Sequence, residues 1–388
     1  MSSELRVGMA GLGAASVQIL PAFRAIKGAR LVGGADVRPE ARAAFTQAFD
    51  VPAYDTVEAL CRSPDIDVVW IATPNMLHCD HAIAAARGGK HVICEKPMAV
   101  TLAECDRMIA ACKQAGVQLI QGHSKIFDAP IRAMREVVQS GRLGPVVQIN
   151  AWNFNNWLQR PRLASEVDTT LGGGLVYRQG PHHVDIVRYI AGGMARSVRG
   201  MAGRRDSHFD TEGNFNALIA FEDGAVANLG FNGYGYFDVT ELTWGVGEGG
   251  DTTDPFWNKP RPRRTGPVAV EAKHSYATTE GPGTGYGERG PRRMPFFGLT
   301  VVSCEKGAIR QSPEGLYVYT EQGREEIPAG PNAQREAELV ELLDALKTNR
   351  TVFPDGKWGR ATLEVCLGIL ESSRTGTEIA LTRQVPSR

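Results

Sequence analysis

The 388-residue sequence has little of what marks several classes of protein. Basic and acidic residues number 43 each, and this zero net charge argues against a nucleic-acid surface spread over the whole protein, although a local basic pocket stays possible. No stretch reaches the roughly 18 apolar residues that a membrane-spanning helix needs. We therefore expect no nucleic-acid partner and no membrane span.

Cysteine is also sparse. The seven cysteines show no C-x-x-C spacing, so free thiols in a reducing cytoplasm are the simplest interpretation. Residues 1–4 lead directly into a strand-like run, without the basic and apolar regions of a signal peptide. The sequence thus predicts a cytoplasmic protein.

What is present is the composition of a folded protein, with 43% hydrophobic and 22% charged residues. Residues 1–122 alternate short apolar runs with longer amphipathic ones. Strands are expected at 5–10, 30–36, 68–72, 91–94 and 118–122, and helices at 15–26, 39–49, 57–61, 78–87 and 102–115. This alternation predicts a doubly wound parallel α/β sheet, a Rossmann domain.

Residues 123–388 follow a different pattern, which predicts an α+β domain with a large, mostly antiparallel, open sheet. Strands are expected at 146–152, 197–202, 214–221, 225–231, 297–303, 308–311 and 316–320, and helices at 129–140, 180–190, 333–348 and 357–374. Short turns at 222–224 and 305–307 favour antiparallel neighbours. Residues 233–296 are rich in Gly and Pro, and we interpret them as a mobile flap near the substrate site or an intersubunit arm.

A glycine motif lies between the first strand and the first helix. Gly11 permits a tight turn, Gly13 lets the backbone approach a pyrophosphate, and Ala14 and Ala15 open the helix whose N–H groups would bind it. Ser16 replaces the third glycine of the usual fingerprint.

An acidic residue follows this motif at the expected distance. Asp36 ends the second strand, where a carboxylate binds ribose hydroxyls and repels a 2′-phosphate, so NAD is favoured over NADP. Arg38 could soften that preference.

Three further motifs occur in order along the chain: Thr73-Pro74-Asn75 with His78, Glu95-Lys96-Pro97, and Gly180-Pro181-His182-His183-Val184-Asp185. Together they resemble the glucose-fructose oxidoreductase/inositol dehydrogenase/rhizopine catabolism (Gfo/Idh/MocA) family over nearly the whole chain. The resemblance implies a Rossmann domain, a second domain with an open sheet, a nicotinamide cofactor, and homodimers or homotetramers built on that sheet.

The resemblance also assigns roles. It implies that Thr73, Asn75, His78 and Glu95 line the cofactor site. Lys96 would face both cofactor and substrate, often after a cis bond to Pro97. His182 matches the catalytic histidine, with Asp185 as its partner on the same helix. His81 would point elsewhere than His78, so the segment His78-Cys79-Asp80-His81 is not expected to bind metal.

These residue types suit the oxidation of a carbinol, which loses a hydride from carbon and a proton from oxygen. A histidine can accept that proton near neutral pH. A lysine ammonium beside the oxygen stabilises the developing alkoxide. Lys96 and His182 are therefore the candidate catalytic residues.

The chain departs from the family where many members carry Asp four residues before the catalytic histidine. Arg178 stands there, and its planar guanidinium matches a substrate carboxylate, unless it pairs with a carboxylate of the protein itself. Lys125, His183 and Asp185 are further candidates for substrate binding. Trp157 could form a wall for a planar ring, although the apolar segment 152–157 could equally be core.

The segments 177–185, 296–305 and 310–313 are similar to one branch of the family, the cis-dihydrodiol dehydrogenases of bacterial phthalate degradation. That similarity implies an aromatic dicarboxylate dihydrodiol as substrate. Two alternatives stay open. One is a dehydrogenase of the same family acting on a sugar, a sugar acid or an inositol. The other is an NAD(P)-sensing binding protein without turnover.

Overall fold

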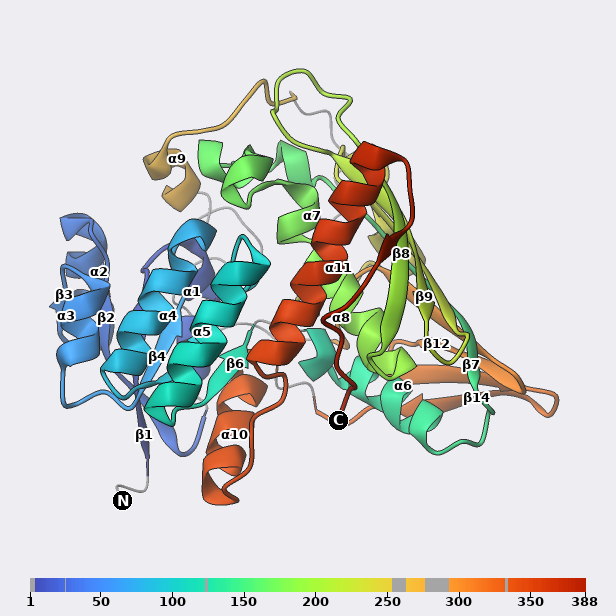
Figure 1. Ribbon diagram of the computed structural model, residues 1–388, viewed down its shortest axis with the longest axis horizontal. Coiled ribbons are helices and arrows are strands. Elements are labelled where there is room, and N and C mark those ends of the chain that lie inside the picture. Colours follow the sequence, from blue (N-terminus) through green and yellow to red (C-terminus); the bar gives the residue numbers. More distant parts are fainter. Residues whose placement is uncertain (1–3, 25, 123–124, 253–262, 276–292, 332–333) are drawn as a thin grey trace. The chain divides into compact units, whose positions relative to one another are not determined.

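A computed structural model of the chain describes residues 4–24, 26–122, 125–252, 263–275, 293–331 and 334–388 (Figure 1). Contacts divide the chain into two units. The first comprises Met1–His123, Val270–Glu288 and Arg335–Leu363; the second comprises Ser124–Ala269, Arg289–Gln334 and Glu364–Arg388. The sequence assigned 335–363 to the second domain. This segment belongs to the first unit because it lies beside the last strand of that unit's sheet. There the Gln121 backbone amide donates a hydrogen bond to the Pro354 carbonyl.

The first unit contains a six-stranded parallel sheet in the order β3-β2-β1-β4-β5-β6, as the sequence predicts. The strands are β1 (Leu5–Ala10), β2 (Ala29–Ala35), β3 (Ala53–Tyr54), β4 (Val68–Ile71), β5 (His91–Cys94) and β6 (Leu119–Gln121). The helices are α1 (Ala14–Ile19), α2 (Pro39–Phe49), α3 (Val57–Arg62), α4 (His78–Arg87), α5 (Leu102–Ala115), α9 (Val270–Ser275) and most of α10 (Gln334–Lys347). All four residues of β4 are buried, as expected for a strand covered on both faces.

Local signals explain where two of these helices end. α1 stops at Ile19 and continues as a 3₁₀ helix, Leu20–Arg24, so the predicted helix over 15–26 is shorter than expected, and Pro21 lies at the change. α5 begins with a capping box between Thr101 and Glu104 and ends at Gly116 with φ 68°. Figure 1 shows α4 and α5 side by side along the sheet.

The second unit contains a nine-stranded sheet in the order β14-β13-β12-β11-β7-β10-β9-β8-β15. Its elements are α6 (Ala129–Gln139), β7 (Val146–Phe154), α7 (Gly174–Arg178), α8 (Gly180–Ala191), β8 (Ala195–Gly203), β9 (Asn214–Phe221), β10 (Val226–Asn232), β11 (Leu299–Cys304), β12 (Gly307–Gln311), β13 (Gly315–Thr320), β14 (Gly323–Pro328) and β15 (Ile379–Ala380). The predicted hairpins β9–β10 and β11–β12 are antiparallel, and β7 and β10 form a parallel pair. The predicted fold class is confirmed.

The two faces of this sheet differ in burial. Ile149 and Ala151 of β7 belong to the hydrophobic core, on the face that α6 and α8 cover. Trp152, the residue after Ala151, is 39% exposed on the opposite face. α11 (Gly356–Thr375) begins in the first unit and ends in the core of the second. No described helix is long and apolar enough to cross a membrane.

The Gly/Pro-rich region 233–296 is only partly described. It contains a 3₁₀ turn, Val239–Leu242, and the short helix α9. Residues 253–262 and 276–292 lie outside the described parts of the chain, so its interpretation as a flap or an arm stays a prediction.

Candidate active site

The turn between β1 and α1 has the geometry of a dinucleotide-binding loop. Gly11 has φ +88°, and a Cβ there would lie 2.8 Å from the Ala72 carbonyl oxygen, so only glycine fits. A Cβ on Gly13 would meet nothing within 4 Å, which means that the backbone faces open space at this point. Because Gly13 is the N-cap, no side chain there competes for the first N–H groups of α1, which Ala14 and Ala15 contribute. The loop therefore fits a pyrophosphate.

Asp36 stands beside this loop at the end of β2. Its carboxylate accepts hydrogen bonds from the Leu12 amide and the Arg38 amide, both at 2.9 Å, and from Arg38 Nε at 3.0 Å. Burial would raise the pKa of Asp36, but the hydrogen bonds from Arg38 and Leu12 outweigh it and hold the pKa below its usual value. The carboxylate is thus ionised and placed for ribose hydroxyls, with a guanidinium adjacent to it.

Replacing Asp36 with alanine should raise the KM for NAD by about tenfold or more, because a hydrogen bond to a charged group contributes roughly 1.5–3 kcal/mol. The change also removes the ion-pair partner of Arg38, whose guanidinium can then bind a 2′-phosphate, so the KM for NADP should fall. The ratio of the two KM values measures both effects. Glu40→Ala, an exposed change on α2, is the control, and an unchanged ratio in Asp36→Ala would remove Asp36 from cofactor selection.

The turn after β4 and the motif after β5 are connected by His78. Its Nδ1 lies 2.9 Å from the Pro97 carbonyl oxygen and its Nε2 lies 2.8 Å from the Thr73 carbonyl oxygen. The side chain is 1% exposed. The ring lies between two backbone carbonyls, and burial lowers its pKa, so the neutral ring donates its single N–H to one of them. Its contact with the cofactor stays a prediction. Asn75 is buried in the same turn.

Glu95-Lys96-Pro97 follows β5 with a cis bond between Lys96 and Pro97, as the family resemblance implies. The Glu95 carboxylate forms an ion pair with Arg335 at the start of α10, and both side chains are largely buried. Sequence reasoning missed Arg335, because 240 positions separate the two residues and no local pattern connects them. We infer that Arg335 is a positioning residue for the loop that carries Lys96.

Replacing Arg335 with methionine should destabilise the chain by about 3–5 kcal/mol, because it removes the guanidinium that pairs with the buried Glu95 carboxylate. The same change should raise the KM for NAD by disturbing the loop. The double variant Arg335→Met/Glu95→Gln should recover most of the stability, since no buried charge remains. Equal melting temperatures for the wild type and Arg335→Met would show that the pair does not hold the loop.

In the second unit, His182 lies in the first turn of α8, after Pro181. Its ring packs edge to face on Phe297, with centroids 4.8 Å apart, and it keeps 5% exposure. The Lys125 ammonium lies 5.8 Å from the centroid of the same Phe297 ring. Lys125 also donates to the Glu248 carbonyl at 2.8 Å. Two candidate residues thus meet on one aromatic ring.

The neighbouring His183 has a different environment. It is fully buried among Phe215, Phe231 and Phe297, and burial lowers its pKa to about 3, so it is neutral. Neither ring nitrogen has a hydrogen-bond partner among the described residues. The expectation that His183 binds substrate is corrected, because successive helical residues point about 100° apart and this one points into the core.

Asp185 is also turned away from solvent. It is 1% exposed and acts electrostatically on Arg188, one turn further along α8. The Arg188 guanidinium is fully buried and donates through Nε to Gln384 at 2.8 Å. Asp185 therefore belongs to a network that fixes α8, and the expectation of direct substrate contact is corrected.

Arg178 ends α7, four residues before His182, and its guanidinium lies 2.9 Å from the Glu166 carboxylate. The pairing with a protein carboxylate, which the sequence left open, is thus present, although 26% of the Arg178 side chain stays exposed. Arg162 lies 3.8 Å from the same carboxylate and stacks 4.3 Å over the Trp157 ring. Trp157 has no exposed surface and is core, so its expected role as a wall for substrate is corrected.

The described residues show no group of three or more His, Cys, Asp or Glu side chains that could hold a metal ion. The fold and the glycine turn define instead a dinucleotide-binding oxidoreductase. Residues 5–123 match the oxidoreductase family model with an NAD-binding Rossmann fold, and residues 131–241 match the Gfo/Idh/MocA C-terminal domain. The chain belongs to the Gfo/Idh/MocA oxidoreductase family, and its cofactor is NAD.

Several known proteins are similar to this chain. A 1-carboxy-3-chloro-3,4-dihydroxycyclohexa-1,5-diene dehydrogenase from Comamonas testosteroni is 36% identical over 95% of both chains. A solved structure from Bordetella bronchiseptica RB50 is 36% identical, covers 97% of this chain and 100% of its own, and superimposes with a TM-score of 0.89. A 1,5-anhydro-D-fructose reductase from Ensifer adhaerens is 35% identical over 35% of this chain and 40% of its own.

Proposed function

We propose that the chain catalyses the NAD-dependent dehydrogenation of a carboxylated aromatic cis-dihydrodiol, specifically phthalate cis-4,5-dihydrodiol to 4,5-dihydroxyphthalate. The similarity to the Comamonas testosteroni enzyme over 95% of both chains carries this proposal, since that enzyme's name describes a carboxylated dihydroxycyclohexadiene. The guanidinium at position 178, where the family resemblance implies an aspartate in many members, supports it.

We assign the proposed chemistry to two residues. Lys96 lowers the pKa of the substrate hydroxyl and stabilises the alkoxide that develops. His182, whose ring packs on Phe297, accepts the hydroxyl proton. A bound NAD would supply the acceptor for the hydride that leaves the carbinol carbon. The resulting enone enolises to an aromatic catechol, so aromatisation makes oxidation the favoured direction.

We assign recognition of the substrate carboxylates to Arg178, because Lys125 is buried and lies 3.4 Å from the Asp128 carboxylate. The Glu166 carboxylate pairs with one side of the Arg178 guanidinium and so fixes its plane. The part of the side chain that stays exposed would bind the substrate carboxylate. An arginine fixed in this way loses less conformational freedom on binding than a free one.

Replacing Arg178 with glutamine should raise the KM for the dicarboxylate diol by about tenfold or more, because a charge-assisted hydrogen bond is lost. The KM for the uncharged cis-benzene dihydrodiol should change little. Arg142→Gln, an exposed change elsewhere in the second unit, is the control. Equal losses on both diols would show that Arg178 is structural and would weaken the dicarboxylate assignment.

We also propose that the chain forms a homo-oligomer through the sheet face opposite α8. Trp152, Leu218 and Met201 are 39%, 51% and 71% exposed there, and an apolar face of this kind is typical of an interface. Sedimentation of the wild type against Leu218→Glu tests this: a fully monomeric wild type would contradict it.

A further inference from the structure

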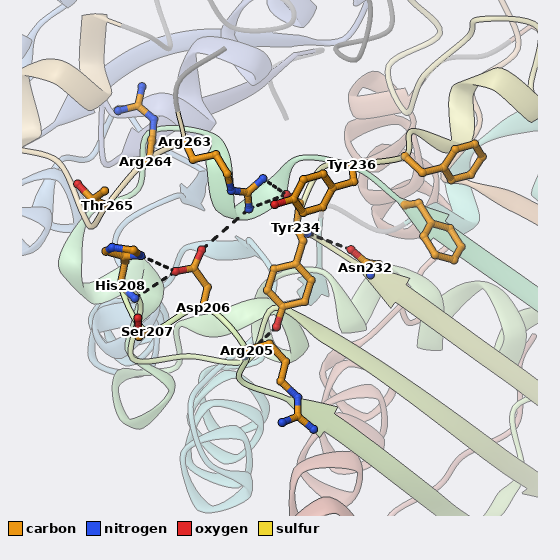
Figure 2. Close-up of a pocket in the computed structure, with 12 residues that line it drawn as sticks. Arg205, Asp206, Ser207, His208, Asn232, Tyr234, Tyr236, Arg263, Arg264 and Thr265 are labelled. Atoms are coloured by element: carbon orange, nitrogen blue, oxygen red, sulfur yellow. Dashed lines mark hydrogen bonds and ion pairs between the residues drawn. The ribbon is translucent and has the colours of Figure 1, made fainter. Parts of the chain in front are cut away.

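A cavity of about 650 Å³ lies within the second unit, at the ends of β7, β8 and β10 (Figure 2). This volume is in the range of small-molecule sites. Its lining consists of Phe154, Arg205, Asp206, Ser207, His208, Asn232, Tyr234, Tyr236, Phe237, Arg263, Arg264 and Thr265. None of these residues belongs to the candidate active site described above.

The alternation of side chains separates this cavity from the surroundings of His182. Phe231 of β10 contacts His183 on the core face of the sheet. Asn232 is the next residue of the strand and therefore lies on the opposite face. Phe154 likewise lies on the same face of the sheet as the exposed Trp152 and on the opposite face from the buried Ala151. The cavity thus opens on the sheet face that α8 does not cover.

Aromatic rings form much of the cavity wall. Phe154 and Phe237 pack edge to face with centroids 5.7 Å apart. The Tyr234 hydroxyl donates to the Gly203 carbonyl and accepts from the Arg205 amide, both at 3.0 Å, which fixes that ring. Tyr236 is 74% exposed, a high fraction for a large aromatic side chain. These rings offer flat surfaces for another ring to stack on.

The charged part of the lining is positive on balance, because it contains three arginines and one carboxylate. The Arg263 guanidinium stacks 4.5 Å over the Tyr236 ring, donates twice to the Tyr234 carbonyl at 3.1 Å, and lies 4.0 Å from Asp206. Asp206 also accepts from the His208 amide at 3.1 Å and from its Nδ1 at 2.8 Å, so the carboxylate is already engaged within the protein. Figure 2 shows Arg263 between Tyr236 and Asp206.

We propose that this cavity is a second binding site, which takes an aromatic carboxylate. The ring would stack against the tyrosine and phenylalanine side chains, and the carboxylate would pair with the fixed guanidinium of Arg263. Nη1 and Nη2 of Arg263 already donate to the Tyr234 carbonyl, so the ligand carboxylate would pair with the guanidinium on its Nε–H side. The assignment uses only the lining of the cavity and does not depend on the reaction proposed above.

Calorimetric titration of the full chain with phthalate, in the absence of NAD, tests the site. Arg263→Gln and Tyr236→Ala should each weaken phthalate binding by tenfold or more, while NADH formation at saturating substrate stays within twofold of the wild type. Arg204→Gln, an adjacent exposed arginine outside the lining, should leave binding unchanged. Cyclohexane-1,2-dicarboxylate has the same charges without the aromatic ring and should bind at least tenfold more weakly.

Three results would overturn the proposal. The first is unchanged phthalate affinity in both lining variants. The second is loss of all phthalate binding in Arg178→Gln alone, which would place the ligand only at the proposed active site. The third is a Tyr236→Ala variant that dissociates an oligomer but binds phthalate normally, which would make the cavity part of a subunit interface. Failure of the proposed reaction would appear separately, as absence of NADH formation from the dihydrodiol.

Discussion

Replacing Lys96 with alanine should lower kcat by about a hundredfold or more, because the developing alkoxide loses the ammonium that stabilises it. Lys96 follows Glu95, whose pairing with Arg335 holds the start of the loop. The loss should therefore appear in kcat, while the affinity for NAD, measured by quenching of protein fluorescence, stays within a few-fold of the wild type.

Two further variants sharpen this prediction. Lys113→Ala removes an exposed lysine from the last turn of α5 and should leave turnover unchanged. Lys96→Arg keeps the charge but displaces it, and should recover only part of the activity. A Lys96→Ala enzyme with turnover close to the wild type would exclude Lys96 from the chemical step.

Replacing His182 with alanine should also lower kcat by about a hundredfold or more, because no other group is assigned to accept the hydroxyl proton. Added imidazole should restore part of the lost activity, since the small base can enter the space that the side chain leaves. A structural role would not give this rescue. The acidic limb of the kcat/KM profile should flatten in the variant, because that limb reports protonation of the catalytic base.

The position of His182 helps to interpret the result. Its ring packs on Phe297, and His183 contacts the same phenylalanine from the core, so a collapse of this cluster is the competing explanation for lost activity. Melting temperatures within a few degrees of the wild type would exclude collapse. Full activity in the His182→Ala variant, or a loss that imidazole does not reverse at any pH, would contradict the assignment.

Local patterns in the sequence were sufficient to predict most of the fold. β4 was predicted because a run of apolar residues is needed for a strand buried on both faces. β14 was missed for the opposite reason: Gly323–Pro328 is an edge strand with mostly exposed side chains and carries three charged residues in succession. The segment Arg335–Leu363 was placed in the wrong unit, since pairing beside β6 is a long-range contact without a local signal.

Only those features of the candidate site that depend on the spacing of motif residues could be predicted from the sequence. Gly11, Gly13 and Asp36 lie where the strand–turn–helix pattern places them. Burial was less predictable: His183 and Asp185 share a motif with His182, yet both are turned into the core. The partners of Arg178 and Glu95 come from residues 12 and 240 positions away, and only the folded chain brings these groups together.

The most direct test of the proposed function is NADH formation, followed by absorbance, with a small panel of substrates: phthalate cis-4,5-dihydrodiol, myo-inositol, glucose and a sugar acid. We expect rapid NADH formation with the dihydrodiol and little with the other three. Turnover with a sugar or inositol and none with the dihydrodiol would contradict the proposed substrate while leaving the fold, the family and the cofactor unchanged.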